Sequence, residues 1–176
     1  MVFAHPNRSP DPSAHALELP DTLIDFAADT TRAIAQLHYS STFARTPDVK
    51  DIFARAGRTA PYLAGRFGII DEMDVIPGAE SRASAAETFR RLYWDTALSW
   101  TDPVLRTLRD IVGIDHVVFG TDYPYLPRDL AVSCRADIAA SPELSEGERT
   151  AVLGATATKL IPRLASLQSK SQARAS

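Results

Sequence analysis

HVVFGTDYP, residues 116–124, joins a short apolar run to a polar loop. The three apolar residues in a row, 117–119, are typical of a strand buried on both faces of a parallel sheet. Gly120 and Pro124 mark the loop that follows, and Asp122 lies within it. The segment therefore predicts a buried parallel strand with an acid just past its carboxyl end.

Three more short apolar segments resemble strands of the same sheet: Val2–Ala4, Val49–Ala54 and Leu92–Thr96. Helical spacing and capping residues predict helices between and after them, over 21–44 with Asp21 as cap, 61–70, 80–91, 101–112, 128–140 and 145–164. This alternation predicts an α/β fold with four β-α units. Four units make half of a TIM-type (β/α)8 barrel, which normally needs about 250 residues. We expect this half-barrel over residues 1–165 and a disordered tail over 166–176.

The composition is that of a globular protein. Apolar residues make up 45% and charged residues 23%, which excludes wholesale disorder. A net charge of -3 provides no basic field, so we expect no nucleic-acid partner. No apolar run approaches the roughly 20 residues that span a bilayer, so we expect no membrane segment. A single cysteine, Cys134, and an opening without the pattern of a signal peptide predict a cytoplasmic protein.

Reactive side chains follow the predicted strands at their carboxyl ends, where α/β proteins bind ligands. These side chains are His5, Arg55, Asp95 and Asp122. Imidazole and carboxylate suit Zn²⁺ or Mn²⁺, and a carboxylate beside such a metal can also move a proton. His5 and Asp122 are only two ligands, however, whereas a catalytic zinc usually takes three from protein.

Each candidate also has a structural explanation. A histidine at a strand end is more often a hydrogen-bonding residue than a ligand, and Asp122 could cap the next helix. Asp95 is expected to accept hydrogen bonds from nearby backbone amides. The arginines could simply form a solvated face that has no function, namely Arg55, Arg58 and Arg66. The remaining candidates are expected to be structural, namely His15, His38, His116 and Cys134.

Ordered motifs extend over nearly the whole chain. They are His5-Pro6 after the first strand, DTTRA at 29–33, LYWDTA at 92–97, VFGTDYP at 118–124 and VLG at 152–154. This set resembles the C-terminal half of the amidohydrolase-related decarboxylases, the group of aminocarboxymuconate-semialdehyde, γ-resorcylate and 6-methylsalicylate decarboxylases. The resemblance runs from Val2 to Leu164, and its most specific part is FGTDYP at 119–124.

The resemblance implies roles for three residues. His5 matches a metal ligand at the end of the fifth barrel strand. Asp122 matches the aspartate at the end of the eighth, which ligates the metal and takes part in proton transfer. Arg66 matches an arginine that in some members reaches the substrate carboxylate of a neighbouring subunit, which implies a homo-oligomer. The implied cofactor is a divalent metal, Zn or Mn, with an incomplete ligand set in this chain.

Two departures from the family pattern bear on this assignment. The family carries Ser-His-Ala-Gly-Gly after its sixth strand, whereas 54–58 reads ARAGR and places Arg55 at the histidine position. An arginine is neither a base near neutral pH nor a common metal ligand, but it can hold a substrate carboxylate. The family's first strand supplies further metal ligands, and the chain shows no such strand. Thr156 also stands where the family has an asparagine.

The implied activity is metal-dependent, cofactor-free decarboxylation of a small aromatic or unsaturated carboxylic acid, with Asp122 as proton donor. One alternative is hydrolysis of a lactone or amide by metal-bound water, with Asp122 as base. Another is an inactive half-barrel that pairs with a complementary half-barrel, because open sheet edges expose unpaired backbone groups.

Overall fold

Four parallel strands form the centre of the molecule in a computed structural model that describes residues 1–7, 19–73, 75–77 and 83–165. The strands lie side by side in chain order: β1 (Val2–Ala4), β2 (Asp51–Phe53), β3 (Tyr93–Asp95) and β4 (Val117–Val118). Their register pairs Ala4 with Phe53, Phe53 with Trp94, and Asp95 with Val118. The predicted α/β fold with four β-α units is confirmed, and all four carboxyl ends meet at one edge of the sheet.

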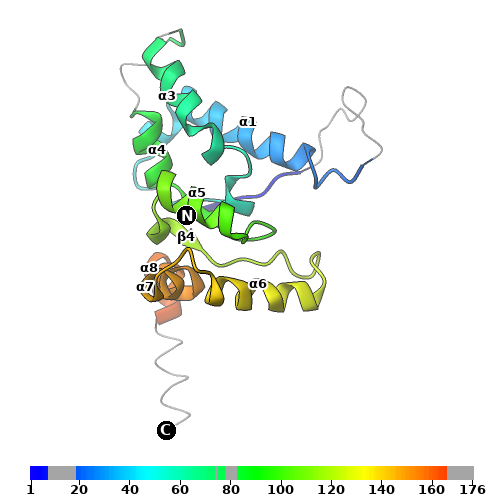
Figure 1. The fold of residues 1–176 in the computed structure, drawn as a ribbon. Helices are drawn as coiled ribbons and strands as arrows, with labels where there is room; N and C mark the ends of the chain where they lie inside the picture. Colours follow the sequence, from blue (N-terminus) through cyan, green and yellow to red (C-terminus); the bar gives the residue numbers. More distant parts are fainter. Residues whose placement is uncertain (8–18, 74, 78–82, 166–176) are drawn as a thin grey trace.

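Helices connect and surround the strands (Figure 1). Figure 1 shows α1 and α3 at one end of the molecule, α6, α7 and α8 at the other, and α5 between them. Their bounds are α1 (Asp25–Tyr39), α2 (Thr42–Arg45), η2 (Arg55–Gly57), η3 (Pro61–Leu63), α3 (Ala64–Met73), α4 (Ala85–Arg91), α5 (Asp102–Ile111), η5 (Ile114–His116), α6 (Arg128–Ala140), α7 (Glu146–Thr150), the π-helical turn η6 (Ala151–Ala155) and α8 (Thr156–Leu160). No helix of the described residues is long and apolar enough to cross a membrane.

The helix predictions are confirmed best where the local signals were strongest. Helix α6 has the expected bounds, and the Ser145–Glu148 capping box is present before α7. The continuous helix expected over 21–44 is wrong, because Ser41 adopts a left-handed backbone (φ 57°) that separates α1 from α2. Asp21 is not its cap either, since α1 begins after Ile24. The helix over 145–164 is divided by η6, and 80–82 and 166–176 lie outside the described residues.

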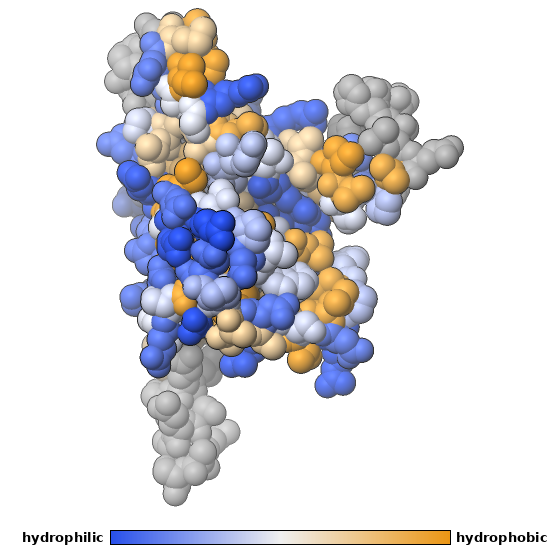
Figure 2. All heavy atoms as spheres, in the orientation of Figure 1, coloured by the Kyte–Doolittle hydropathy of each residue, from blue (hydrophilic) through white to orange (hydrophobic). Residues whose placement is uncertain are grey.

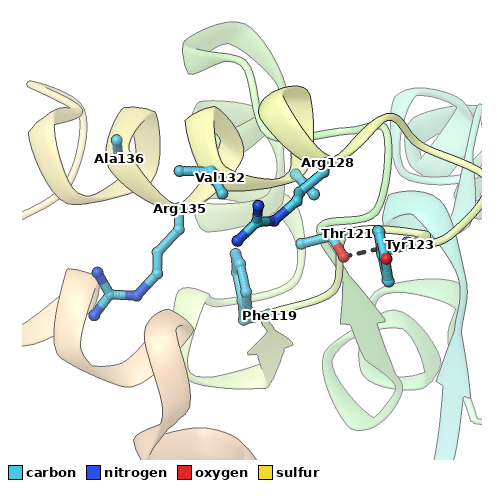
Figure 3. A pocket seen from close by; sticks show the side chains of 8 residues that line it. Phe119, Thr121, Tyr123, Arg128, Val132, Arg135 and Ala136 are labelled. Atoms are coloured by element: carbon cyan, nitrogen blue, oxygen red, sulfur yellow. Dashed lines mark hydrogen bonds between the residues drawn. The ribbon is translucent and has the colours of Figure 1, made fainter.

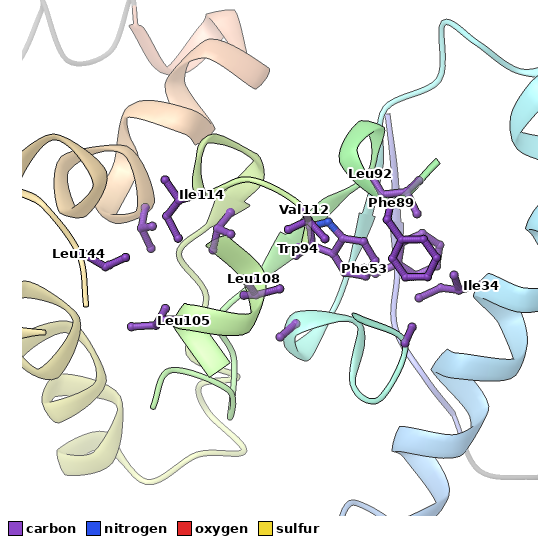
Figure 4. Packing of buried hydrophobic residues seen from close by; sticks show 14 of the residues in the cluster. Ile34, Phe53, Phe89, Leu92, Trp94, Leu105, Leu108, Val112, Ile114 and Leu144 are labelled. Carbon is purple, nitrogen blue, oxygen red and sulfur yellow. The ribbon is translucent and has the colours of Figure 1, made fainter. Parts of the chain in front are cut away.

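The hydrophobic core lies between the sheet and the helices, and aromatic rings fill its centre (Figure 4). The Trp94 ring is fully buried and stacks on Phe89 of α4, with ring centroids 5.7 Å apart. Phe53 of β2 packs against the same indole at 6.1 Å. Because Trp94 lies on β3 between these partners, its position is fixed from several sides.

Strand β1 differs from the expected buried strand. Val2 and Phe3 are 49% and 53% exposed. The reason is position rather than sequence: β1 lies at an edge of the sheet, where only β2 pairs with it.

The residues expected to be structural are so where the structure describes them. His38 is buried and its ring nitrogens lie 3.1 Å from Thr88 Oγ1 and 3.2 Å from Asp71 Oδ1. His116 Nδ1 lies 3.0 Å from the carbonyl oxygen of Leu92. Cys134 is buried, and this burial raises the pKa of its thiol to about 11. His15 lies outside the described residues.

Candidate active site

Three of the predicted site residues meet at the carboxyl edge of the sheet. His5 follows β1, Arg55 follows β2, and Asp122 lies in the loop after β4. His5 Nε2 lies 3.8 Å from Asp122 Oδ1, and Arg55 Nη2 donates a hydrogen bond of 2.5 Å to Asp122 Oδ2. The Asp122 carboxylate is therefore shared between an imidazole and a guanidinium. This cluster is the candidate active site.

The loop after β4 turns the Asp122 side chain toward this cluster. Asp122 has a left-handed backbone (φ 67°), which a non-glycine residue adopts only where its surroundings impose it. Its carbonyl oxygen accepts a 3.1 Å hydrogen bond from the Leu126 amide, which closes the loop. The Asp122 side chain is only 11% exposed, whereas that of His5 is 44% exposed.

Asp95 holds Arg55 in place through the backbone. Asp95 Oδ1 accepts hydrogen bonds from the amide of Arg55 (2.6 Å) and from the amide of Ala97 (2.9 Å). The hydroxyl of Ser99 donates to the carbonyl oxygen of Arg55 at 3.1 Å. The prediction that Asp95 binds nearby amides is confirmed. Its burial raises the pKa of the Asp95 carboxyl, which the two amide hydrogen bonds oppose.

Replacing Asp95 by alanine should lower the free energy of unfolding by about 2–4 kcal/mol, because two buried amides lose their acceptor. Asp95→Asn should cost clearly less, since both amides bind Oδ1 and an asparagine retains that oxygen. Urea unfolding followed by circular dichroism measures both. Equal losses in the two variants would contradict this role.

The Arg55 side chain is buried and does not belong to a solvated face, which corrects that alternative. Its side chain is 3% exposed, and its Cζ lies 5.5 Å from the ring centroid of Phe26 on α1. Nη2 binds Asp122, but Nε and Nη1 have no hydrogen-bond partner in the part of the chain that the structure describes. A buried guanidinium with two free donors is suited to an anionic ligand.

Arg58 also belongs to the region around Arg55. The sequence alone did not indicate this role of Arg58. It is half-buried, and its Nε and Nη2 are buried without a hydrogen-bond partner within the described ranges. Burial, and then the charge of Arg55, lower the pKa of Arg58 to about 10. The only signal in the sequence was the ARAGR run itself, which places a second arginine at a family glycine position.

Arg66 does not join the cluster. It lies exposed on α3, and none of the hydrogen bonds or ion pairs found among the described residues links it to His5, Arg55 or Asp122. The predicted contact with a neighbouring subunit's substrate stays a prediction.

The pair of His5 and Asp122 fits one divalent cation as a partial ligand set. Two ligands that each bind a metal at about 2.1 Å can be up to about 4 Å apart, and their atoms are 3.8 Å apart. Arg55 is a competing positive charge on the same carboxylate. Within the described ranges, no three His, Cys, Asp or Glu side chains are grouped closely enough to hold a metal. These residues therefore provide two ligands of a larger set.

A cavity of about 580 Å³ lies on the other side of the Asp122 loop, between that loop and α6. Figure 3 shows Phe119, Thr121 and Tyr123 facing α6, from which Arg128 and Val132 extend toward them. Asp122 lies between Thr121 and Tyr123 in the chain, but it does not line the cavity. The cavity is thus adjacent to the cluster but separate from it.

Comparisons with known proteins relate the chain to a family and to solved structures. The amidohydrolase family matches residues 2–163. The 6-methylsalicylic acid decarboxylase of Penicillium expansum is 31% identical over 98% of this chain and 53% of its own length. The chain spans about half the length of the curated relatives it matches.

Solved structures show the same fold. The 5-carboxyvanillate decarboxylase of Sphingomonas paucimobilis has a TM-score of 0.77 and 21% identity, over 91% of this chain and 48% of that chain. A dihydroxybenzoic acid decarboxylase from Polaromonas, solved with manganese and 2-nitroresorcinol, has a TM-score of 0.75 and 24% identity, over 90% and 48%.

Proposed function

This chain belongs to the amidohydrolase family, and on that premise we propose that it is the C-terminal half of a metal-dependent decarboxylase of small aromatic carboxylic acids. The relatives' names support the reaction, since several are decarboxylases of hydroxylated benzoic acids. The solved relative with bound manganese supports Mn²⁺ as the metal, and Zn²⁺ is the alternative that suits the same ligands.

The observation that carries the proposal is the separation of 3.8 Å between His5 Nε2 and Asp122 Oδ1. The two residues are 117 positions apart in the sequence and follow the two outer strands of the sheet, β1 and β4, yet their side chains meet. They meet at the carboxyl ends of the strands, where barrel enzymes place their chemistry. His5 and Asp122 would hold the metal, together with ligands from outside this chain.

A metal bound at this site would polarise the substrate's carboxylate or adjacent hydroxyl. Asp122 in its acid form gives its proton to the ring carbon that bears the carboxylate, which interrupts aromaticity. The bond to that carboxylate then breaks, its electron pair restores the aromatic ring, and carbon dioxide leaves. Asp122 regains a proton from water. Arg55 orients the substrate through the donors that Asp122 does not use.

The direct test is release of ¹³CO₂ from carboxyl-labelled hydroxybenzoic acids in the presence of Mn²⁺ or Zn²⁺. We expect release of carbon dioxide and one equivalent of the decarboxylated arene. The alternative, hydrolysis of a lactone or amide with Asp122 as base, yields an acid and no carbon dioxide. Hydrolysis products without ¹³CO₂ would therefore contradict the decarboxylase and support the hydrolase.

The exposed sheet edges favour a further property, assembly with a complementary half-barrel or with another copy. Val2 and Phe3 are exposed on edge strand β1, and Leu130 and Val132 are 49% and 63% exposed on α6 beside β4. Figure 2 shows hydrophobic side chains at the surface over the residues leading into α1 and over the start of α6. A further set of parallel strands would pair the edges and cover these side chains.

By itself the chain should bind Zn²⁺ or Mn²⁺ with a Kd weaker than about 1 μM, because it provides two ligands and Arg55 competes for one of them. Titration calorimetry measures the affinity. Arg55→Gln should tighten binding, since Asp122 then loses its guanidinium partner. Stoichiometric binding by the unaltered chain below 1 μM would contradict the partial ligand set.

A further inference from the structure

We propose that Arg55 and Arg58 form a two-arginine receptor for a carboxylate that remains on the product, so that the substrate of this site is a dicarboxylic aromatic acid. The inference rests on the proposed decarboxylase function and specifies its substrate class. Nothing in the family pattern provides this receptor, because the two arginines replace a histidine and a glycine.

The backbone places both side chains in one tight turn. Residues 55–58 all have left-handed backbones, with φ between 57° and 61°, and the Arg58 amide donates to the Arg55 carbonyl oxygen at 3.0 Å. Asp95 and Ser99 hold this turn at the carboxyl edge of the sheet. Left-handed backbone is costly for Arg55, Ala56 and Arg58, so the surrounding contacts impose the conformation.

The side chains have more donors than the protein has acceptors for them. Arg55 is nine-tenths buried or more, yet its Nε and Nη1 have no partner among the described residues, and the same holds for Nε and Nη2 of Arg58. Buried charged donors rarely stay without an acceptor, because each costs free energy of desolvation. Four such nitrogen atoms in one turn match the oxygen atoms of a bound carboxylate.

The charges lead to the same ligand. The turn contributes two guanidinium groups, and Asp122 pairs directly with one nitrogen of Arg55. Asp95 Oδ1 binds the amides of Arg55 and Ala97, and the charges of Asp122 and Asp95 raise the pKa of Arg58. Burial, and then the charge of Arg55, lower that pKa by more, and a bound anion would offset both.

The chemistry indicates which carboxylate is held. The carboxylate that leaves loses its negative charge as its bond to the ring breaks. Two arginines bound to it would stabilise the ground state more than the transition state and would slow the reaction. Arginines bound to a second carboxylate keep their ion pair throughout the reaction and position the ring beside Asp122. The substrate therefore carries one carboxylate for anchoring and one for loss.

Binding of isophthalate and of benzoate to the 176-residue chain, measured by titration calorimetry, tests this receptor without any need for turnover. We expect isophthalate to bind at least about tenfold more tightly than benzoate. Arg58→Gly and Arg58→Asn should both abolish this preference. Glycine accepts the backbone of Arg58 (φ 60°, ψ −116°), so Arg58→Gly preserves the folding. The control variant, Arg90→Gln at an exposed position of α4, should retain the preference.

Equal affinity for the two acids, or a preference that both Arg58 variants retain, would overturn the receptor. Failure of the proposed function has a different signature. If isophthalate binds more tightly in a way that depends on Arg58, but no dicarboxylic acid releases carbon dioxide, the receptor is supported and the decarboxylase proposal is contradicted. If monocarboxylic acids release carbon dioxide and Arg58→Gly leaves the rate unchanged, the decarboxylase proposal is supported and the receptor is contradicted.

Discussion

Asp122→Asn should lower the rate of carbon dioxide release by a factor of about 10²–10⁴, the usual contribution of a positioned proton donor. An asparagine has nearly the same shape but cannot give a proton to the ring carbon. It also removes the negative charge that lies 3.8 Å from His5 and that a divalent cation would require. Rates of ¹³CO₂ release at saturating substrate and metal measure this effect on kcat.

Asp129→Asn is the matched control, because Asp129 is exposed in the first turn of α6, seven residues further along the chain. It should leave the rate within about twofold. A similar rate for Asp122→Asn and the unaltered chain would show that Asp122 is not the proton donor. Loss of activity in both variants would point to folding instead.

Gly57→Ala should destabilise the fold by at least about 3 kcal/mol and leave little folded protein at about 37 °C. A β-carbon at this position would lie 2.0 Å from Cζ3 of Trp94, far inside contact distance. The indole cannot withdraw, since Phe53 and Phe89 pack against it. The left-handed backbone of Gly57 (φ 61°) adds a further penalty for alanine.

Gly65→Ala is the control for this substitution. Nothing lies within 4 Å of a β-carbon at Gly65, which is exposed on α3. There alanine should stabilise the helix by up to about 1 kcal/mol. Urea unfolding of both variants, followed by tryptophan fluorescence, should give changes of opposite sign. A mild effect of Gly57→Ala would mean that the Arg55–Arg58 turn and Trp94 are not in tight contact.

The sequence predicted the elements whose determinants are local. Apolar runs indicated all four strands, and the helical spacing of 128–140 matched the bounds of α6. The capping box at Ser145 is a pattern of four residues and was equally clear. The break at Ser41 was not visible, because a serine carries no strong preference for a left-handed backbone.

The site was predictable only in part. Parallel strands place their carboxyl ends at one edge, so the placement of His5 and Asp122 at the same edge followed from the sequence. Their separation of 3.8 Å did not, because β2 and β3 lie between their strands. The burial of Arg55 and Arg58 did not follow, because arginine is usually exposed. Tertiary contacts hold Arg55 inward, namely its ion pair with Asp122, its backbone hydrogen bond to Asp95 and the ring of Phe26. The exposure of Val2 and Phe3 depends on the position of β1 at the edge of the sheet, which no local sequence pattern predicts.

The most direct test of a shared cation at His5 and Asp122 is paramagnetic line broadening by Mn²⁺ in the amide NMR spectrum of the chain, which detects even weak binding. We predict that signals around His5 and Asp122 broaden first and together, and that His5→Ala or Asp122→Asn each abolishes this broadening. Broadening centred elsewhere on the described surface, or unchanged in both variants, would contradict the shared site.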